Sequence, residues 1–176
     1  MALRIAVTGT PGVGKSTLVR KVVETLQGKD CRCRIGGVMA ADKRVKERRV
    51  GFELLDLGSG ARGMLADETG TGPQLGKYKV RLDDLDNVGA KSVEDALGSD
   101  LIVVDEVGPM ELSSRRFIAA VEKALASKKP MLVVLHEWSS HPLAKKVRKN
   151  FKVITVTREN RDTLAEEITR EFRPKR

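Results

Sequence analysis

The clearest chemical signal is a glycine-rich octapeptide near the start of the chain, where Gly9 to Ser16 read GTPGVGKS. This spacing is typical of a phosphate-binding loop, or P-loop, whose backbone N–H groups surround phosphate oxygens. The lysine of such a loop reaches the β- and γ-phosphates of a nucleotide, and the next hydroxyl ligates Mg²⁺. We therefore expect Lys15 to act in catalysis and Ser16 to hold the metal. The expected nucleotide contacts are Gly9, Thr10, Pro11, Gly12, Val13, Gly14, Lys15, Ser16 and Thr17.

The segments on either side of the octapeptide support this interpretation. Residues 3–7 (LRIAV) form an apolar run that predicts a buried strand, and the apolar residues of the following TLVRKVVETL recur at helical spacing. A strand, a tight turn and a helix place the positive end of the helix against the phosphates. Gly12 and Gly14 permit the tight turn because they lack a Cβ. This context favours a phosphate site over a glycine-rich turn that binds nothing.

A pair of acids provides the second half of the expected chemistry. Residues 100–107 (DLIVVDEV) predict a buried strand that ends in Asp105 and Glu106. Ligands of open α/β sheets bind at the carboxyl ends of strands, so we expect Asp105 to hold Mg²⁺ beside Ser16, directly or through water. Glu106 is positioned to take a proton from a water that attacks the γ-phosphate. Two consecutive acids are typical of P-loop ATPases of the additional-strand class; the alternative is an exposed acidic turn.

Several other residues have two interpretations. Glu111 either assists Glu106 or caps the helix expected to begin at Ser113 or Ser114, and we favour the structural role. In TRENRD, Asn160 and Arg161 either approach the nucleotide base or open the last helix, with Asn160 or Asp162 as its N-cap. The cap is the favoured interpretation.

The cysteines and histidines are the remaining candidates for a metal site. Cys31 and Cys33 form a lone C-x-C, and His136 and His141 lie about a hundred residues away. These spacings are not those of a zinc finger. A reduced cysteine pair at the start of a strand is the favoured interpretation.

Composition limits the fold and the partners. The 176 residues fit one domain, 1–176, and 40% of them are hydrophobic but only 3% aromatic. A core of Val, Ile, Leu and Ala suits a parallel sheet covered by helices on both faces. The net charge of +9 suits a polyanionic ligand, either a nucleotide or a nucleic acid. No secretory signal or membrane-length apolar run is seen, so we expect a cytoplasmic protein with no membrane partner.

Strands and helices alternate along the rest of the chain, which predicts β-α-β units. Residues 42–49 (DKRVKERR) predict a polar turn and residues 67–76 a loop, within an antiparallel insertion over roughly 34–82. Further strands are expected over 31–41, 50–57, 61–66, 77–82, 131–135 and 153–156. Further helices are expected over 85–97 with a weak point at Gly89, from Ser113 or Ser114 to about 127, and over 142–149 and 161–172.

Several motifs in this order resemble one family. GTPGVGKST, RVGFELLDL with ARGMLA, GKYKV, VVDEVGPMEL, HPLAKKVR and TRENRD together resemble the Thep-type nucleoside-triphosphatases, also called cancer-related nucleoside-triphosphatases. The resemblance extends from Leu3 to about Phe172. It implies a three-layer, RecA-like P-loop fold in the α/β class. It also implies slow hydrolysis of ATP, GTP, CTP and UTP to the diphosphate and phosphate, with broad base tolerance.

The same resemblance extends the nucleotide site to the acidic strand and marks one departure. Some relatives have a lysine where this chain has Pro109. If that lysine neutralises charge in the transition state, this chain must use another cation or do without one. Candidates are the basic residues of 42–49 (Lys43, Arg44, Lys46, Arg48 and Arg49) and the pair Arg115 and Arg116. The nucleotide contacts implied by the resemblance are Leu101, Ile102, Val103, Val104, Asp105, Glu106, Val107 and Gly108.

Two other functional classes remain open. A nucleoside or nucleotide kinase would use the same loop with a hydroxyl acceptor in place of water, although residues 42–49 are short for an arginine-rich lid. A nucleotide-dependent accessory or RNA-binding module would use the basic residues of 42–49 and 145–149. One Trp, one Tyr and four Phe give this module little capacity for base stacking.

Overall fold

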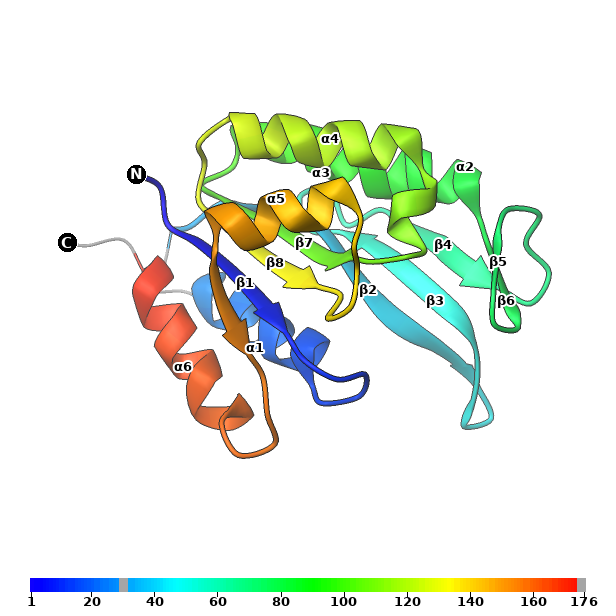
Figure 1. The fold of residues 1–176 in the computed structure, drawn as a ribbon, viewed down its shortest axis with the longest axis horizontal. Helices are drawn as coiled ribbons and strands as arrows, with labels where there is room; N and C mark the ends of the chain where they lie inside the picture. Colours follow the sequence, from blue (N-terminus) through cyan, green and yellow to red (C-terminus); the bar gives the residue numbers. More distant parts are fainter. Residues whose placement is uncertain (29–31, 174–176) are drawn as a thin grey trace.

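A single mixed sheet organises the molecule in the computed structural model, which describes residues 1–28 and 32–173. Within those residues the strand order is β5-β6-β4-β3-β2-β7-β8-β1-β9 (Figure 1). The strands are β1 (Arg4–Thr8), β2 (Ile35–Val45), β3 (Arg48–Asp56), β4 (Arg62–Asp67), β5 (Gln74–Leu75), β6 (Tyr78–Val80), β7 (Leu101–Val107), β8 (Met131–Leu135) and β9 (Lys152–Thr155).

Helices cover both faces of the sheet, which makes three layers (Figure 1). One face carries α1 (Lys15–Leu26) and α6 (Arg161–Phe172), and the other carries α3 (Lys91–Asp95), α4 (Arg115–Ala126) and α5 (Pro142–Asn150). The short α2 (Leu82–Asp84) precedes a π-helical turn, Leu85–Ala90. Together with the family shown below, this architecture confirms the expected α/β fold of the P-loop class.

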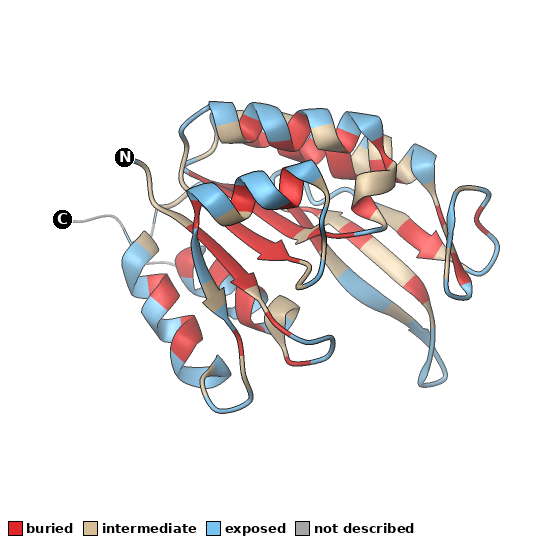
Figure 2. Ribbon diagram, in the orientation of Figure 1, coloured by how far each residue is buried: buried red, intermediate tan, exposed pale blue. Residues whose placement is uncertain are grey.

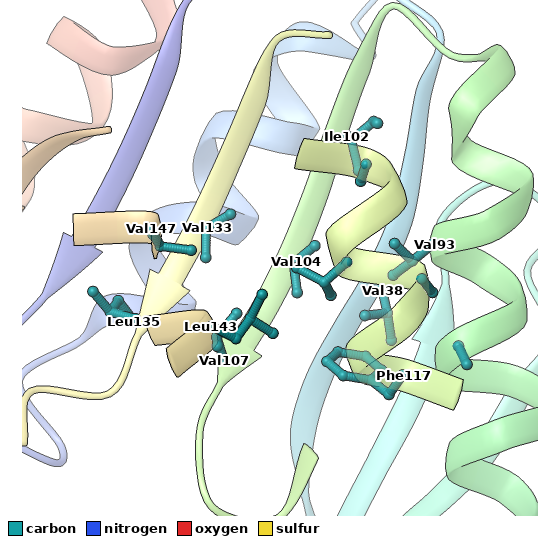
Figure 3. Close-up of a cluster of buried hydrophobic side chains, with 14 of the residues drawn as sticks. Val38, Val93, Ile102, Val104, Val107, Phe117, Val133, Leu135, Leu143 and Val147 are labelled. Atoms are coloured by element: carbon teal, nitrogen blue, oxygen red, sulfur yellow. The ribbon is translucent and has the colours of Figure 1, made fainter. Parts of the chain in front are cut away.

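The central strands are apolar throughout because helices cover both faces of the sheet. Successive side chains of a strand point to opposite faces, and here both faces are covered. Ile102 and Val104 of β7 face α3, α4 and α5 together with Val133 of β8 (Figure 3). Val103 and Val134 face α1 and α6. Most of β1, β7 and β8 is therefore buried, while the tip of the β2–β3 hairpin is exposed (Figure 2).

The five strands β2, β7, β8, β1 and β9 form the parallel part of the sheet. β8 lies between β1, which leads into the P-loop, and β7, which ends in the acids. β3, β4, β6 and β5 add an antiparallel meander, as expected for the insertion. β2 belongs to both parts, because its first residues pair with β7 and its later residues with β3.

Three local predictions differ from the structure. Residues 42–49 are not one polar turn: β2 and β3 continue through them, and only Lys46 and Glu47 form the turn, with φ of 48° and 64°. Residues 67–76 include the short strand β5. The helix expected over 85–97 is a π-helical turn, then α3, then a 3₁₀ turn, Ala96–Gly98.

Candidate functional site

The P-loop connects the end of β1 to the start of α1. α1 begins at Lys15, and its N-cap Gly14 has a φ of 108°, a left-handed conformation that side chains with a Cβ rarely adopt. A Cβ at Gly9 would lie 2.8 Å from the carbonyl oxygen of Val156, so the loop is also packed against the segment after β9. The glycines at these two positions are therefore required by the backbone path.

Lys15 is held at the mouth of this loop. Its ammonium donates to the carbonyl oxygens of Gly9 at 2.5 Å and Thr10 at 3.1 Å. Because carbonyl oxygens are neutral acceptors, anionic phosphate oxygens would compete well for the same ammonium N–H groups.

Ser16 and Asp105 are in contact at the carboxyl edge of the sheet, although β8 lies between β1 and β7. The Ser16 hydroxyl donates to Asp105 Oδ1 at 3.1 Å, and the Ala40 N–H donates to Asp105 Oδ2 at 3.4 Å. Asp105 is only 2% exposed, and burial together with the charge of Glu106 raises its pKa to about 7. The two residues expected to bind metal are thus in contact, although they lie 89 positions apart in the chain.

Glu106 occupies an irregularity at the end of β7. Asp105 pairs with Val134 and Val107 with Leu135, so Glu106 is an extra residue in the ladder, as in a β-bulge that redirects a side chain. Its carboxyl lies close to Gly108, where an added Cβ would be 3.0 Å from Glu106 Oε1. Burial raises the pKa of Glu106, and the positive charges of Lys15 and His136 oppose that rise.

Glu111 is near Asp105 and Glu106. It lies in the 3₁₀ turn Glu111–Ser113 and is 5% exposed. Burial and the nearby charge of Glu106 raise the pKa of Glu111 well above its usual range. The cap of α4 is Ser114, whose hydroxyl accepts from the Phe117 N–H at 3.0 Å. Glu111 is therefore a buried neighbour of the site with a raised pKa, and the cap of α4 is Ser114.

The other side of the P-loop is closed by the turn into α6. Arg161 donates from Nη1 to the carbonyl oxygen of Val13 at 3.2 Å. Asn160 stands at the N-cap position, but its side chain accepts from the Thr157 N–H at 2.8 Å and makes no cap bond. A hollow of about 270 Å³ opens beside this contact. It is lined by Gly14, Thr17, Leu18, Lys21, Arg161 and Asp162.

The predicted residues of β7 divide into two groups. Leu101, Ile102, Val103 and Val104 are buried in the two apolar layers, whereas the acids and Gly108 lie at the strand end with the P-loop. Val107 is buried under α5 (Figure 3). The chemistry is thus concentrated in the last residues of the motif.

Five of the seven cations considered as replacements for a lysine at position 109 have other partners. Lys43 bonds Glu53 at 2.8 Å, and Arg116 bonds Glu94 at 3.0 Å through two nitrogens. Arg44 bonds Asp42, Arg48 bonds Glu68, and Arg49 bonds the Tyr78 hydroxyl. Sequence reasoning instead missed His136, whose charge acts on Glu106, and Arg20, whose charge lowers the pKa of Asp105.

The oxygen ligands at this edge suit a hard divalent cation. One carboxylate and one hydroxyl, completed by water and substrate phosphates, match the way Mg²⁺ is usually held. Over residues 1–28 and 32–173, no group of three or more His, Cys, Asp and Glu side chains could hold a metal by itself. Cys31, one of the four residues considered for zinc, lies outside the described residues. Nor does any helix in those ranges have the length and apolarity to cross a membrane.

Comparison with known proteins identifies the family. A family model described as NTPase matches residues 4–169, nearly the whole chain. The chain belongs to this NTPase family. The resemblance to the Thep-type nucleoside-triphosphatases is confirmed by a nucleoside-triphosphatase THEP1 from Methanosarcina acetivorans, which is 54% identical over 97% of each chain. A THEP1 from Archaeoglobus fulgidus is 42% identical over 96% of this chain and 98% of its own.

Two solved structures agree with this membership of the NTPase family. The crystal structure of THEP1 from Aquifex aeolicus has a TM-score of 0.80 at 31% identity and covers 94% of this chain and 96% of that one. The solution structure of a human cancer-related nucleoside triphosphatase has a TM-score of 0.79 at 32% identity and covers 96% of each.

We expect Asp105 to make the stability of this NTPase-family member depend on pH. Because the pKa of Asp105 is raised to about 7, the native chain holds a proton that the unfolded chain has lost between pH about 4 and 7. The free energy of unfolding therefore falls with rising pH over that range. Asp105→Asn should remove this loss and, above pH 7 in a chelator, exceed wild type on the order of 4 kcal/mol.

Denaturant unfolding of both chains across this pH range measures the difference. Asp100→Asn is the matched control, because Arg34 lowers the pKa of Asp100 and this substitution should bring no gain at high pH. A constant difference between Asp105→Asn and wild type from pH 4 to 8 would contradict the assignment.

Proposed function

We propose that this chain hydrolyses nucleoside 5′-triphosphates to the diphosphate and phosphate in the presence of Mg²⁺. The observation that carries the proposal is the contact between Ser16 of the P-loop and the buried Asp105 at the end of β7. That contact joins a phosphate-binding loop to a metal-binding carboxylate. Glu106, the next residue, adds a carboxyl beside both.

The roles of the residues follow from their chemistry. The N–H groups of the P-loop bind the phosphates, and Lys15 neutralises charge on the β- and γ-phosphates. Ser16 and Asp105 would hold Mg²⁺, which stabilises negative charge on the leaving diphosphate when bound. Glu106 orients a water and accepts its proton as the water oxygen bonds the γ-phosphorus and the bond to the β-phosphate oxygen breaks. Its raised pKa suits a group that must take up this proton.

We place the nucleoside of the bound triphosphate in the hollow beside Arg161. It adjoins Gly14 and Thr17, at the α-phosphate end of a P-loop, and four of its six lining residues, Thr17, Lys21, Arg161 and Asp162, are exposed. A shallow, open site of this kind would discriminate weakly between bases. This fits broad use of ATP, GTP, CTP and UTP, and slow turnover fits a site in which most of the proposed basic residues are engaged elsewhere.

Arg161→Ala tests this side of the site. The substitution removes the bond to the Val13 carbonyl and one wall of the hollow. We expect KM for the triphosphate to rise about 5- to 10-fold, equivalent to one hydrogen bond, while kcat stays within about twofold. Arg170→Ala, an exposed arginine of the same helix, is the control. A fall in kcat with unchanged KM would contradict this role.

A phosphate-release panel tests the proposed function itself. ATP, GTP, CTP and UTP are each supplied with Mg²⁺ or with a chelator, and the nucleotide product is identified. We expect diphosphate and phosphate in equal amounts from all four, and none in the chelator. Transfer of the phosphoryl group to an added nucleoside would instead favour a kinase.

A further inference from the structure

The turn after β8 is the third element at the edge where the P-loop and the acids meet. β8 is bordered by β1 and β7, so this turn emerges between the P-loop strand and the acidic strand (Figure 1). It begins at His136, whose N–H donates to the carbonyl oxygen of Val107 at 3.2 Å. The backbone of His136 is therefore fixed to the residue that follows Glu106.

One side chain of α5 holds this turn in place. The Arg148 guanidinium donates to the carbonyl oxygens of Ser139 at 2.6 Å and of His136 and Glu137 at 3.1 Å each. A guanidinium that binds three carbonyls fixes the path of the backbone more firmly than a single contact would. The backbone that carries the His136 side chain is therefore held in one conformation.

A backbone contact also defines which ring nitrogen carries the proton. The Trp138 N–H donates to His136 Nδ1 at 3.3 Å, so Nδ1 is the acceptor and the ring N–H is on Nε2. The imidazole lies close enough to the Glu106 carboxyl for the two groups to interact electrostatically. The neutral ring therefore offers its Nε2–H as a donor at the same edge of the sheet as the P-loop and Glu106.

We propose that His136 is a catalytic residue that donates Nε2–H to an oxygen of the γ-phosphoryl group during hydrolysis. This inference rests on the proposed function. The bond from the γ-phosphorus to the β-phosphate oxygen breaks while the water oxygen bonds that phosphorus, and the proton of the water goes to Glu106. His136 keeps its own proton and stabilises charge on an equatorial oxygen, the part that a cation plays in related phosphoryl transfers.

The test compares three histidine variants at the level of binding and chemistry. His136→Ala removes the donor, His136→Gln retains an N–H donor, and His141→Asn alters the other histidine while keeping its cap on the Leu143 N–H. For each we would measure kcat, the Kd for Mg²⁺ with the non-hydrolysable analogue AMP-PNP, and the Kd for Mg²⁺, ADP and aluminium fluoride, which mimics the transferring phosphoryl group.

For His136→Ala we expect kcat to fall about 100-fold, which is the effect of losing one donor to a developing charge. Affinity for the aluminium fluoride complex should fall by a similar factor, while affinity for AMP-PNP changes less than about threefold. His136→Gln should recover at least about tenfold of the lost kcat, and His141→Asn should match wild type.

Two results would overturn the role of His136. One is a kcat for His136→Ala within about threefold of wild type; the other is an equal loss of affinity for both analogues, which would show only a damaged loop. A wild-type chain that releases no phosphate would overturn the proposed function instead, so the two failures are distinguishable.

Discussion

Glu106→Gln should bind nucleotide as tightly as the wild-type chain and lose about 10²- to 10⁴-fold in kcat, the contribution of a positioned general base. Glutamine keeps the size and hydrogen-bonding reach of the side chain but cannot accept the proton of the attacking water. The loss should appear in kcat and kcat/KM together, because the interaction is made only in the transition state. Single-turnover phosphate release and equilibrium titration with AMP-PNP measure the two quantities separately.

Glu111→Gln is the matched control for this substitution. Glu111 is 5% exposed, and burial and the charge of Glu106 raise the pKa of its carboxyl, which favours the protonated form. A glutamine resembles the protonated carboxyl, so we expect Glu111→Gln to stay within about threefold of the wild-type kcat. If Glu111→Gln were inactive and Glu106→Gln active, the two acids would have to exchange roles.

Lys15→Ala should instead weaken nucleotide binding strongly. The ammonium is held at the mouth of the P-loop by the carbonyl oxygens of Gly9 and Thr10, where phosphate oxygens would replace both acceptors. Loss of two charge-assisted hydrogen bonds, at about 1.5–3 kcal/mol each, corresponds to about 10²- to 10⁴-fold in Kd. Isothermal titration with AMP-PNP in Mg²⁺ measures this change.

Lys91→Ala separates this effect from a general loss of positive charge. Lys91 is an exposed lysine of α3, on the other face of the sheet, where it pairs with Asp95. Its removal should leave Kd unchanged. A Lys15→Ala chain with wild-type affinity would show that the triphosphate binds elsewhere.

The parts of the site that sequence predicts best are those fixed by local chemistry. The P-loop pattern specifies its own glycines and lysine, and the apolar run before Asp105 specifies a strand with acids at its end. That Ser16 and Asp105 touch also follows from a general rule, because both lie at the carboxyl edge of one parallel sheet.

The parts that sequence predicts poorly depend on tertiary contacts. The insertion of β8 between β1 and β7 is a choice of strand order that no local pattern encodes, and it brings His136 to the acids. The sequence suggests His136 only as a candidate metal ligand, because spacing in the chain does not reveal that it lies near the acids. The contact between Arg161 and Val13 joins residues 148 positions apart.

Local patterns also failed where the backbone takes an unusual path. Polar residues at Lys46 and Glu47 suggest a longer turn, but both adopt positive φ and allow a tight hairpin between β2 and β3. Gly89 weakens an otherwise helical pattern and falls in the π-helical turn. There an added Cβ would lie 3.0 Å from a Leu85 methyl carbon and 3.5 Å from one of Leu54. Packing against β3 therefore constrains this segment in addition to helix propensity.

Hydrolysis in water enriched in ¹⁸O tests most directly whether the carboxyl edge of this sheet directs water onto the γ-phosphorus. After turnover of ATP with Mg²⁺ by the wild-type chain, mass spectrometry should find ¹⁸O in the released phosphate and none in the ADP. Glu106→Gln should give neither product at a comparable rate. Label in the nucleotide product, or release of pyrophosphate with AMP, would place the attack at another phosphorus and contradict the roles proposed for Lys15, Asp105 and Glu106.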